Sequence, residues 1–359
     1  MKQVSLDYTA QFSCLAGACP DTCCKDWEII LDEADVARYR ALPGPLGEQV
    51  RAAITVTPEG EAVWRLVDGH CALLRPDGLC PIQCTCGEEA LCRTCQTHPR
   101  FWEEYGATRE LTLALSCPGA ARLLLSHTSP LHLTETELDA PVTPNDLDPA
   151  LYLALRRVRT AMIRLAQPRS LALPDRLGLI LRLAERVQPL LDAAHYGPIP
   201  ALCREFEALS PRQLALVRRQ MRPRAPFFPC WMVLRNMEHL TTRFPWLLDR
   251  ANHAEPPDSF DTRFPLQAEN LLVYFLFRYV LKAVNDGQLL PRAESCIFHL
   301  LSLRYLCGAA GALTPDALQP VVSLYCKEVE HSEENLRLLQ RIFSRDTISP
   351  RALYRMLLP

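Results

Sequence analysis

The sequence is poor in glycine and lacks the motifs that glycine builds around nucleotides. It holds 14 glycines in 359 residues, and no G-x-G-x-x-G pattern follows a strand-like run. A Rossmann-type fold for dinucleotides or S-adenosylmethionine (SAM) depends on such a turn, because its glycines let the backbone approach the ligand. The P-loop and the zinc-protease motif H-E-x-x-H are also absent. These absences disfavour the common nucleotide-binding and metalloprotease classes.

Net charge is also small. The formal charge is -2, so the composition indicates no nucleic-acid partner. The balance along the chain is uneven, since residues 1–120 hold 10 Lys and Arg against 17 Asp and Glu, which leaves 29 against 24 for the remainder. Most such charges simply solvate a surface, and the other interpretation is that the acidic third attracts a basic partner.

Long hydrophobic runs are missing too. The longest, residues 271–284, is interrupted by Arg278 and Lys282 and is too short to cross a bilayer, so it predicts a buried helix. The N-terminus, MKQVSLDYTAQFSC, lacks the apolar core of a signal peptide. We therefore expect a cytoplasmic protein with no membrane partner, in a compartment where thiols stay reduced and disulfides are rare.

Cysteine, in contrast, is abundant. Eleven of the 16 cysteines fall in the first 117 residues, and the other five are scattered singly through apolar, helix-like segments. A lone free cysteine usually behaves as a small buried hydrophobe. We expect that behaviour of the five scattered ones, which are Cys203, Cys230, Cys296, Cys307 and Cys326.

The clustered cysteines have the spacing of metal ligands. Four lie within residues 14–24, a second group lies within residues 71–95, and one more follows. Close spacing on turn-forming chain lets several sulfurs converge, as thiolates do around zinc or an iron–sulfur cluster. Disulfides are the disfavoured alternative. The predicted metal ligands are Cys14, Cys19, Cys23, Cys24, Cys71, Cys80, Cys92, Cys95 and Cys117.

The kind of metal stays open at this point. Nine thiols exceed one tetrahedral zinc or one cubane cluster, so two four-sulfur sites and one cluster with spare thiols both fit the count. Structural zinc sites usually carry paired C-x2-C knuckles, and only Cys92 and Cys95 form one. The radical-SAM spacing C-x3-C-x2-C is absent, although Cys80-x3-Cys84-x-Cys86 comes near it.

Beyond the last clustered cysteine the sequence becomes helical. Apolar residues from Leu151 to Leu165 recur at steps of four and three, which is typical of an amphipathic helix. Serine or threonine before proline at positions 210, 314 and 349 predicts helix starts. Further helices are expected at residues 174–195, 267–285, 293–307 and 333–344, and the best strand-like runs are residues 64–74 and 110–116.

These patterns predict a mainly α protein. We expect a cysteine-rich metal- or cluster-binding region with few short strands at residues 1–125. A linker rich in Pro, Thr and Asp follows at residues 126–149, and a helical domain occupies residues 150–359.

Several motifs stand out along the chain: the opening string FSCLAGACPDTCCKDWEIILDE (residues 12–33), the cysteine block of residues 71–100, LSCPGAARLLL (115–125), ENLLVYFLFR (269–278) and YCKEVEHSEENL (325–336). These motifs resemble the flagellin lysine N-methylase family, which lies within a wider group of cysteine-cluster proteins that chelate zinc or iron. The middle of the chain is only generically similar.

The resemblance implies a methyltransferase that uses SAM to methylate lysine side chains of flagellin, with a [4Fe-4S] cluster on the nine cysteines. Cys84 and Cys86 depart from the family pattern and are therefore doubtful ligands. The alternative is a non-catalytic zinc- or iron-chelating protein, in which the thiolates only stabilise the fold.

Candidates for other roles follow from charge and position. Glu330, His331 and Glu334 lie in one acidic segment. A single helix through it would place the two glutamates on one face, where they could act as a base or position the amine. The alternative interpretation is a charged helix surface with no catalytic role. Arg93 and Arg100 are candidates for the SAM carboxylate or for the charge of a cluster, and surface ion pairing explains them equally well. Trp27 is predicted to cover the centre, and His70 and His98 are further possible ligands.

Overall fold

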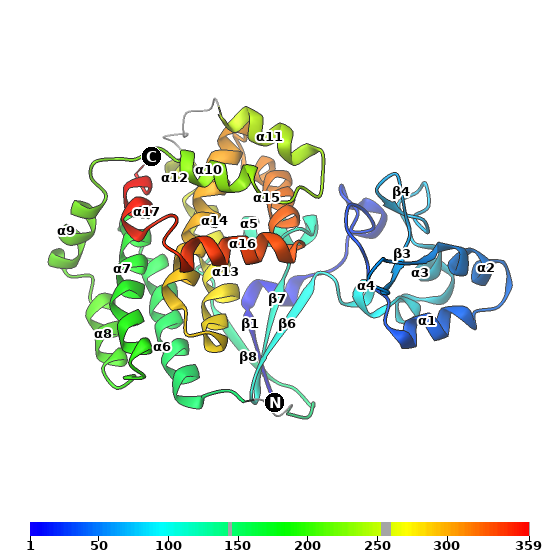
Figure 1. Ribbon diagram of the computed structural model, residues 1–359, viewed down its shortest axis with the longest axis horizontal. Coiled ribbons are helices and arrows are strands. Elements are labelled where there is room, and N and C mark those ends of the chain that lie inside the picture. The colour runs from blue at the N-terminus through cyan, green and yellow to red at the C-terminus, as the bar shows by residue number, and fades with distance from the viewer. Residues whose placement is uncertain (143–145, 253–259, 359) are drawn as a thin grey trace.

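The computed structural model describes residues 1–142, 146–252 and 260–358. Its described residues pack around two separate hydrophobic cores (Figure 1). One core belongs to a small lobe on the right of the figure, which we call the cysteine lobe (residues 13–99). The other belongs to a larger helical body, which also holds the first strand and the main sheet. The prediction of a mainly α protein is confirmed.

The cysteine lobe is built from short elements. Its core consists of eleven buried residues, two of which are cysteines: Ile29, Leu31, Tyr39, Val50, Ala53, Trp64, Cys71, Leu73, Ile82, Leu91 and Cys92. Its elements are η2 (Ala16–Ala18), α1 (Glu33–Arg40), α2 (Gly44–Ala53), β2 (Ile54–Val56), β3 (Ala62–Trp64), β4 (Leu66–Val67), β5 (His70–Cys71), α3 (Pro81–Cys86), η3 (Glu88–Ala90) and α4 (Arg93–Thr97).

A four-stranded sheet in the helical body joins distant parts of the chain in the order β6-β7-β1-β8. The strands are β1 (Lys2–Leu6), β6 (Arg100–Tyr105), β7 (Thr108–Leu113) and β8 (Leu133–Glu137). β1 runs parallel to β7, and the other two pairings are antiparallel. The strand β8 lies inside the segment 126–149 that was predicted as a linker, of which residues 143–145 lie outside the described part. The predicted domain limits themselves stay a prediction.

The helices pack in one body beside this sheet (Figure 1). They are η1 (Asp7–Gln11), α5 (Pro118–Ser126), α6 (Pro149–Ala166), α7 (Leu173–Asp192), α8 (Ile199–Glu207), α9 (Pro211–Gln220), α10 (Phe228–Arg235), α11 (Arg243–Asn252), α12 (Phe260–Arg263), α13 (Pro265–Tyr279), η4 (Val280–Asn285), α14 (Leu289–Ala310), α15 (Pro315–Glu330), α16 (Glu333–Ser344) and α17 (Pro350–Met356).

Local sequence signals account for many of these helices. The side chains of Ser210, Thr314 and Ser349 each accept a hydrogen bond from a backbone N–H in the first turn of α9, α15 and α17. A proline follows each one, where its missing N–H costs nothing. The three helix starts are therefore confirmed, and so are the predicted helices that correspond to α6, α7, α13, α14 and α16.

A buried ion pair ties the sheet to the helices. Arg159 on α6 forms two hydrogen bonds with Glu110 on β7, at 2.5 and 2.6 Å, and both side chains are at most 5% exposed. A charge this deeply buried requires its partner, because water no longer solvates it. The pair therefore holds β7 against α6.

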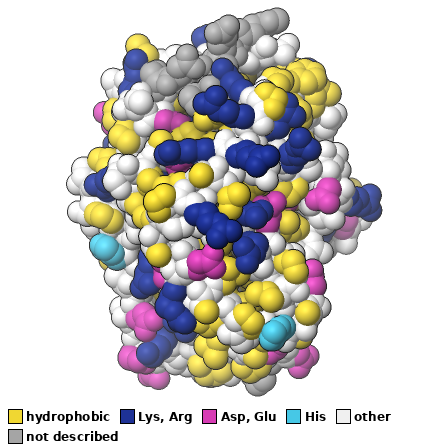
Figure 2. All heavy atoms as spheres, turned by 90° about the vertical axis from the view of Figure 1, so that its left-hand side faces the viewer, with side chains coloured by type: hydrophobic (Ala, Val, Ile, Leu, Met, Phe, Trp, Pro, Cys, Tyr) yellow, Lys and Arg dark blue, Asp and Glu magenta, His cyan; other side chains and the backbone are white. Residues whose placement is uncertain are grey.

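The outer helices carry a strongly basic surface. Between Glu207 and Glu238 the sequence has six arginines and no aspartate or glutamate. Figure 2 shows Lys and Arg side chains gathered on the face formed by the helices at the left of Figure 1. None of the described helices is long and apolar enough to span a membrane.

Candidate metal centre and adjoining pocket

The nine predicted ligands come from loops and helix starts. The first four lie on the irregular chain around η2, and Cys71 ends β5. Cys80, Cys92 and Cys117 each occupy the position just before a helix, which are α3, α4 and α5. The unpaired N–H groups of a first helical turn favour a negative charge there, and thiolates profit from this. Cys117 is the one predicted ligand that the helical body supplies.

The charges of neighbouring thiols raise one another's pKa values in two groups of cysteines, and Cys23 belongs to both groups. Burial raises the pKa of Cys71 to about 11, and the charges of Cys24, Cys80 and Cys92 add to the effect. In the second group, burial raises the pKa of Cys117, and the charges of Cys19 and Cys14 raise it further. Thiols of both groups affect the pKa of Cys23. Its hydrogen bond to Cys24 and its burial raise this pKa, and the charges of Cys24, Cys117 and Cys14 raise it further.

Two close pairs acquire thiolate character. A hydrogen bond from the Cys23 thiol lowers the pKa of Cys24 to about 6, and a hydrogen bond from Cys95 lowers the pKa of Cys92. The thiolate is the form that binds metals, so the lowered pKa of one sulfur in each pair favours ligation.

The donor set fits a soft metal. Among the described residues, no three His, Cys, Asp or Glu side chains converge closely enough to hold a metal ion as they stand. The predicted ligands are all sulfur donors, the donor type that zinc and iron–sulfur clusters take. All sixteen cysteines are free thiols. Which of the nine bind a metal, and which metal, stays a prediction.

The five scattered cysteines behave differently. Cys203, Cys230, Cys296, Cys307 and Cys326 are at most 1% exposed, within the large core. Their predicted role as small buried hydrophobes is confirmed. Cys84, in contrast, is exposed on α3, and Cys86 is half-buried at the end of the same helix.

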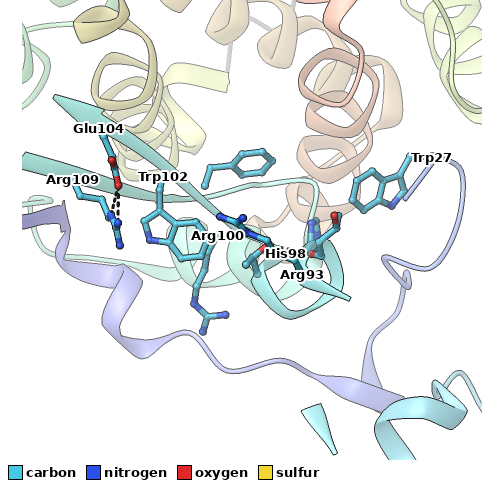
Figure 3. Close-up of a pocket in the computed structure, with 10 residues that line it drawn as sticks. Trp27, Arg93, His98, Arg100, Trp102, Glu104 and Arg109 are labelled. Carbon is cyan, nitrogen blue, oxygen red and sulfur yellow. Dashed lines mark hydrogen bonds and ion pairs between the residues drawn. The ribbon is translucent and has the colours of Figure 1, made fainter. Parts of the chain in front are cut away.

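A cavity of about 560 Å³ opens beside the cysteine lobe (Figure 3). The structure brings Arg93 on α4 and Arg100 on β6 to the same cavity, together with Trp27. The other lining residues are Thr94, Thr97, His98, Phe101, Trp102, Glu104 and Arg109. The cavity adjoins the thiols, because α4 contributes both its lining and Cys95.

Two rings that line this cavity, those of Trp27 and His98, pack with the ring of His331 from a distant segment. The ring centroid of Trp27 lies 4.8 Å from that of His331 and 5.6 Å from that of His98. The indole Nε1 of Trp27 donates to the backbone carbonyl of Cys23 at 2.7 Å, and the predicted role of Trp27 as a cover for the centre stays a prediction. His70 lies elsewhere, with Nδ1 2.9 Å from the Asp68 carbonyl oxygen.

Both histidines are neutral near pH 7. Burial lowers the pKa of His98 to about 4 and that of His331 to about 3, with the Lys327 charge acting in the same direction. His331 Nε2 lies 2.7 Å from Ser116 Oγ. An imidazole with so low a pKa is a weak base, so it is poorly suited to remove a proton from an ammonium group.

The expected helix that carries Glu330 and Glu334 together is wrong. Glu330 ends α15, and Glu334 lies in the first turn of α16. The chain breaks between them because the Ser332 side chain accepts a hydrogen bond from the Asn335 N–H and starts a new helix. Glu334 is exposed and pairs with Arg341, whereas Glu330 is buried. The two glutamates therefore do not share a helix face.

Glu330 belongs to a buried network that the sequence did not indicate. Its carboxylate accepts a hydrogen bond from the Tyr279 hydroxyl at 2.6 Å and pairs with Arg278 Nε at 3.1 Å. Tyr274 donates to the same carboxylate at 3.3 Å. The sequence feature that could have indicated this network is Arg278, a charged residue inside an apolar run. A carboxylate with these partners is a structural anchor for the adjacent His331.

The fold and site together define a helical protein with a thiol-rich lobe beside a cationic, aromatic cavity. A family model described as the FliB lysine N-methylase C-terminal domain matches residues 159–354, more than half of the chain. The chain therefore belongs to the FliB lysine N-methylase family. The match includes much of the middle segment that seemed only generically similar.

Named relatives agree with this assignment. The lysine-N-methylases of Salmonella typhimurium strain LT2 and Salmonella choleraesuis are each 30% identical over 144 residues, which is 38% of this chain. The chain spans 36% of the length of these two relatives. The flagellar biosynthetic protein FliU of Salmonella muenchen has the same identity over 144 residues, 85% of its own length. No solved structure matches the chain.

Proposed function

We propose that the chain is a SAM-dependent protein-lysine N-methyltransferase that acts on flagellin, with a [4Fe-4S] cluster held by its nine clustered cysteines. The observation that carries the proposal is the cavity that contains Arg93 and Arg100 and is lined by α4, the helix that carries Cys95. Family membership and the names of the relatives support the same reaction.

The cavity has the chemistry that a zwitterionic methyl donor requires. Two guanidinium groups, of Arg93 and Arg100, offer paired donors to a carboxylate. The Arg100 guanidinium also lies 5.2 Å from the centroid of the Phe12 ring, which orients it. A volume of about 560 Å³ is within the range of small-molecule sites.

SAM supplies a sulfonium methyl group that an amine nitrogen can displace, and the chain must bring a neutral amine to it. Trp27 and Trp102 give the cavity apolar walls, which disfavour a charged ammonium group and exclude water. The neutral His98 and His331 add no positive charge near the wall. The amine loses its proton to solvent before the transfer, and the nitrogen loses a second proton after it.

The decisive experiment is methyl transfer by the anaerobically purified chain. With SAM and flagellin from the same cell, mass spectra should show lysines that carry added methyl groups. Arg93→Ala and Arg100→Ala should each raise the KM for SAM about tenfold or more, since each removes a charge-assisted hydrogen bond. Arg75→Ala is the matched control, because Arg75 is exposed and pairs with Asp77 away from the cavity.

Metal and sulfide content should be measured on the same preparation. Iron with acid-labile sulfide would support the cluster, and assays with and without a low-potential reductant separate direct displacement from a radical route. A preparation that holds only zinc and leaves flagellin unmethylated would contradict the proposal.

A second function rests on the small core of the cysteine lobe. Only eleven buried residues hold it, and two of them are cysteines. A metal that merely stabilises this fold is the non-catalytic alternative. The zinc-only outcome above would favour it.

A further inference from the structure

The end of α9 and the chain that follows it form a hollow lined by arginines. Its volume is about 760 Å³, and its lining residues are Arg219, Arg222, Pro223, Arg224 and Leu358. No acidic residue among the described ones lines it. Three guanidinium groups that share a hollow repel one another, so an anionic partner is favoured there.

The arginines of this region outnumber their carboxylate partners. Arg218 pairs with Asp175 at 2.6 Å, and Arg235 pairs with Asp249 at 2.7 Å. The other four arginines of residues 208–237 are exposed, and the ion pairs of the described part of the chain do not include them. Those four are Arg212, Arg219, Arg222 and Arg224.

On α9, an exposed apolar side chain lies between two of these arginines. Leu216 is 41% exposed, and it follows Arg212 by four residues and precedes Arg219 by three. This spacing places all three side chains on the outward face of the helix. Figure 2 shows Lys and Arg interspersed with hydrophobic side chains on this side of the molecule.

The exposed side of α10 continues the same pattern. Phe228 is 56% exposed and Met232 is 39% exposed, and the two residues are one helical turn apart. Four residues of chain lead from Arg224 to Phe228, so their Cα atoms lie within about 14 Å of each other. We call the four unpaired arginines together with Leu216, Phe228 and Met232 the basic surface.

We propose that the basic surface binds an anionic lipid membrane at the level of its headgroups. The inference goes beyond the proposed function and does not rest on it. Lipid phosphates supply the negative charge that the arginines require, and the boundary of the acyl region takes up the exposed apolar side chains. A nucleic acid offers phosphates but no apolar phase for Leu216 and Met232.

Binding through this surface leaves the cysteine lobe away from the lipid. Figure 1 places α9 at the opposite end of the molecule from the lobe. The expectation of no membrane partner rested on the lack of apolar runs long enough to cross a bilayer. That lack does not bear on binding at the membrane surface, which depends on charge and on a few inserted side chains.

Vesicle sedimentation with the full chain, purified without oxygen, tests the proposal. Vesicles that contain phosphatidylglycerol should sediment the chain at about 0.1 M salt, whereas pure phosphatidylcholine vesicles should not. Binding should fall steeply at about 0.5 M salt, because salt screens exposed charges. Equal binding to both kinds of vesicle, or binding to neither, would overturn the proposal.

Arginine variants locate the binding on the surface. Arg219→Ala combined with Arg222→Ala should weaken vesicle binding about 25-fold, at about fivefold for each arginine near an anionic surface. Lysine at the same two positions should keep most of the affinity, because the charge remains. Arg337→Ala combined with Arg341→Ala is the matched control, since it removes two arginines from α16. Equal affinities of the two alanine pairs would contradict the proposal.

The apolar part of the surface distinguishes lipid from other anions. Phe228→Ser should weaken vesicle binding about fivefold or more, because it removes apolar area from the lipid. Leu313→Ser is the control, since Leu313 is 67% exposed outside the basic surface. Full vesicle binding by the Phe228 variant would overturn the proposal. Duplex DNA or polyglutamate that binds more tightly than the vesicles at equal salt would assign the surface to that polymer and overturn it as well.

Discussion

The cysteine lobe and the helical body reach stability by different means. The lobe buries eleven residues in its own core, whereas the core of the helical body extends from β1 and the sheet through every helix from α5 to α17. Small domains bury too little apolar surface to offset chain entropy, and metals or cross-links then make up the difference. Thiols lie within the lobe core itself, as Cys71 and Cys92 show. With the proposed metal, the comparison predicts a metal-dependent lobe on a self-sufficient helical body.

The contacts that join the two parts include ion pairs, the thiols, and the ring of Trp27 against that of His331. Asp21 pairs with Arg243 at 3.0 Å, and Asp26 lies 3.5 Å from the ammonium of Lys327. Cys117 adds a sulfur from the helical body to the thiols of the lobe. Loss of the metal should therefore loosen the lobe and its junction before it affects the helices.

The largest expected effect comes from removing a ligand in the lobe. Cys92→Ser or Cys24→Ser should abolish metal binding and unfold the lobe, because structural metal sites contribute about 10 kcal/mol or more to such folds. Metal content and hydrogen exchange resolved by region are the measurements. The helices should keep their protection.

The matched control is a cysteine of the large core. Cys203→Ser should keep the metal and cost about 1 kcal/mol of stability. If both substitutions cost the same, or if ligand removal also melts α6 and α14, the contrast between the two parts is wrong.

The helical body should instead be destabilised by a buried charge that has lost its partner. Arg159→Met leaves Glu110 buried without its partner and should lower the free energy of unfolding by about 3–5 kcal/mol. Urea unfolding followed by helical circular dichroism measures the loss, while metal content should not change. The control Arg337→Met removes an exposed pair with Glu333 and should cost less than about 0.5 kcal/mol. Loss of the metal in the Arg159 variant would show that the two parts depend on each other.

A smaller effect concerns pH in the helical body. Glu294 is fully buried with no hydrogen-bond partner among the described residues, and burial raises its pKa from 4.5 to about 9, helped by the charges of Asp346 and Glu185. Between these values the folded state holds a proton that the unfolded chain has lost. The contribution of Glu294 to the free energy of unfolding is therefore largest below about pH 4.5 and declines as the pH rises towards 9.

Glu294→Gln removes that dependence. Relative to the parent chain, the variant should gain about 2 kcal/mol in the free energy of unfolding between pH 6 and pH 7.5, at about 1.4 kcal/mol per pH unit. Unfolding curves at the two pH values provide the measurement. Parallel pH profiles of parent and variant would mean that Glu294 is ionised in the folded state.

Sequence patterns predicted the helices well and the sheet poorly. Helix starts are local, because a hydroxyl before proline caps its own first turn, and α16 occupies residues 333–344 as expected. The predicted strand of residues 64–74 instead contains β4 and β5, with a turn between them. Neither β1 nor β8 was expected, since each has only five residues and they pair across more than 125 positions of sequence.

Sequence alone determined the helical periodicity, the caps, and the division of cysteines into clustered and scattered sets, because spacing and local composition carry that information. Only the tertiary structure decided that Arg93, Arg100 and Trp27 share one cavity and that His331, from the other end of the chain, packs against the Trp27 ring. It also separated Glu330 from Glu334, since one serine cap ended the helix between them. Such proximities arise when distant segments bury their apolar faces together, and no short stretch of sequence records the outcome.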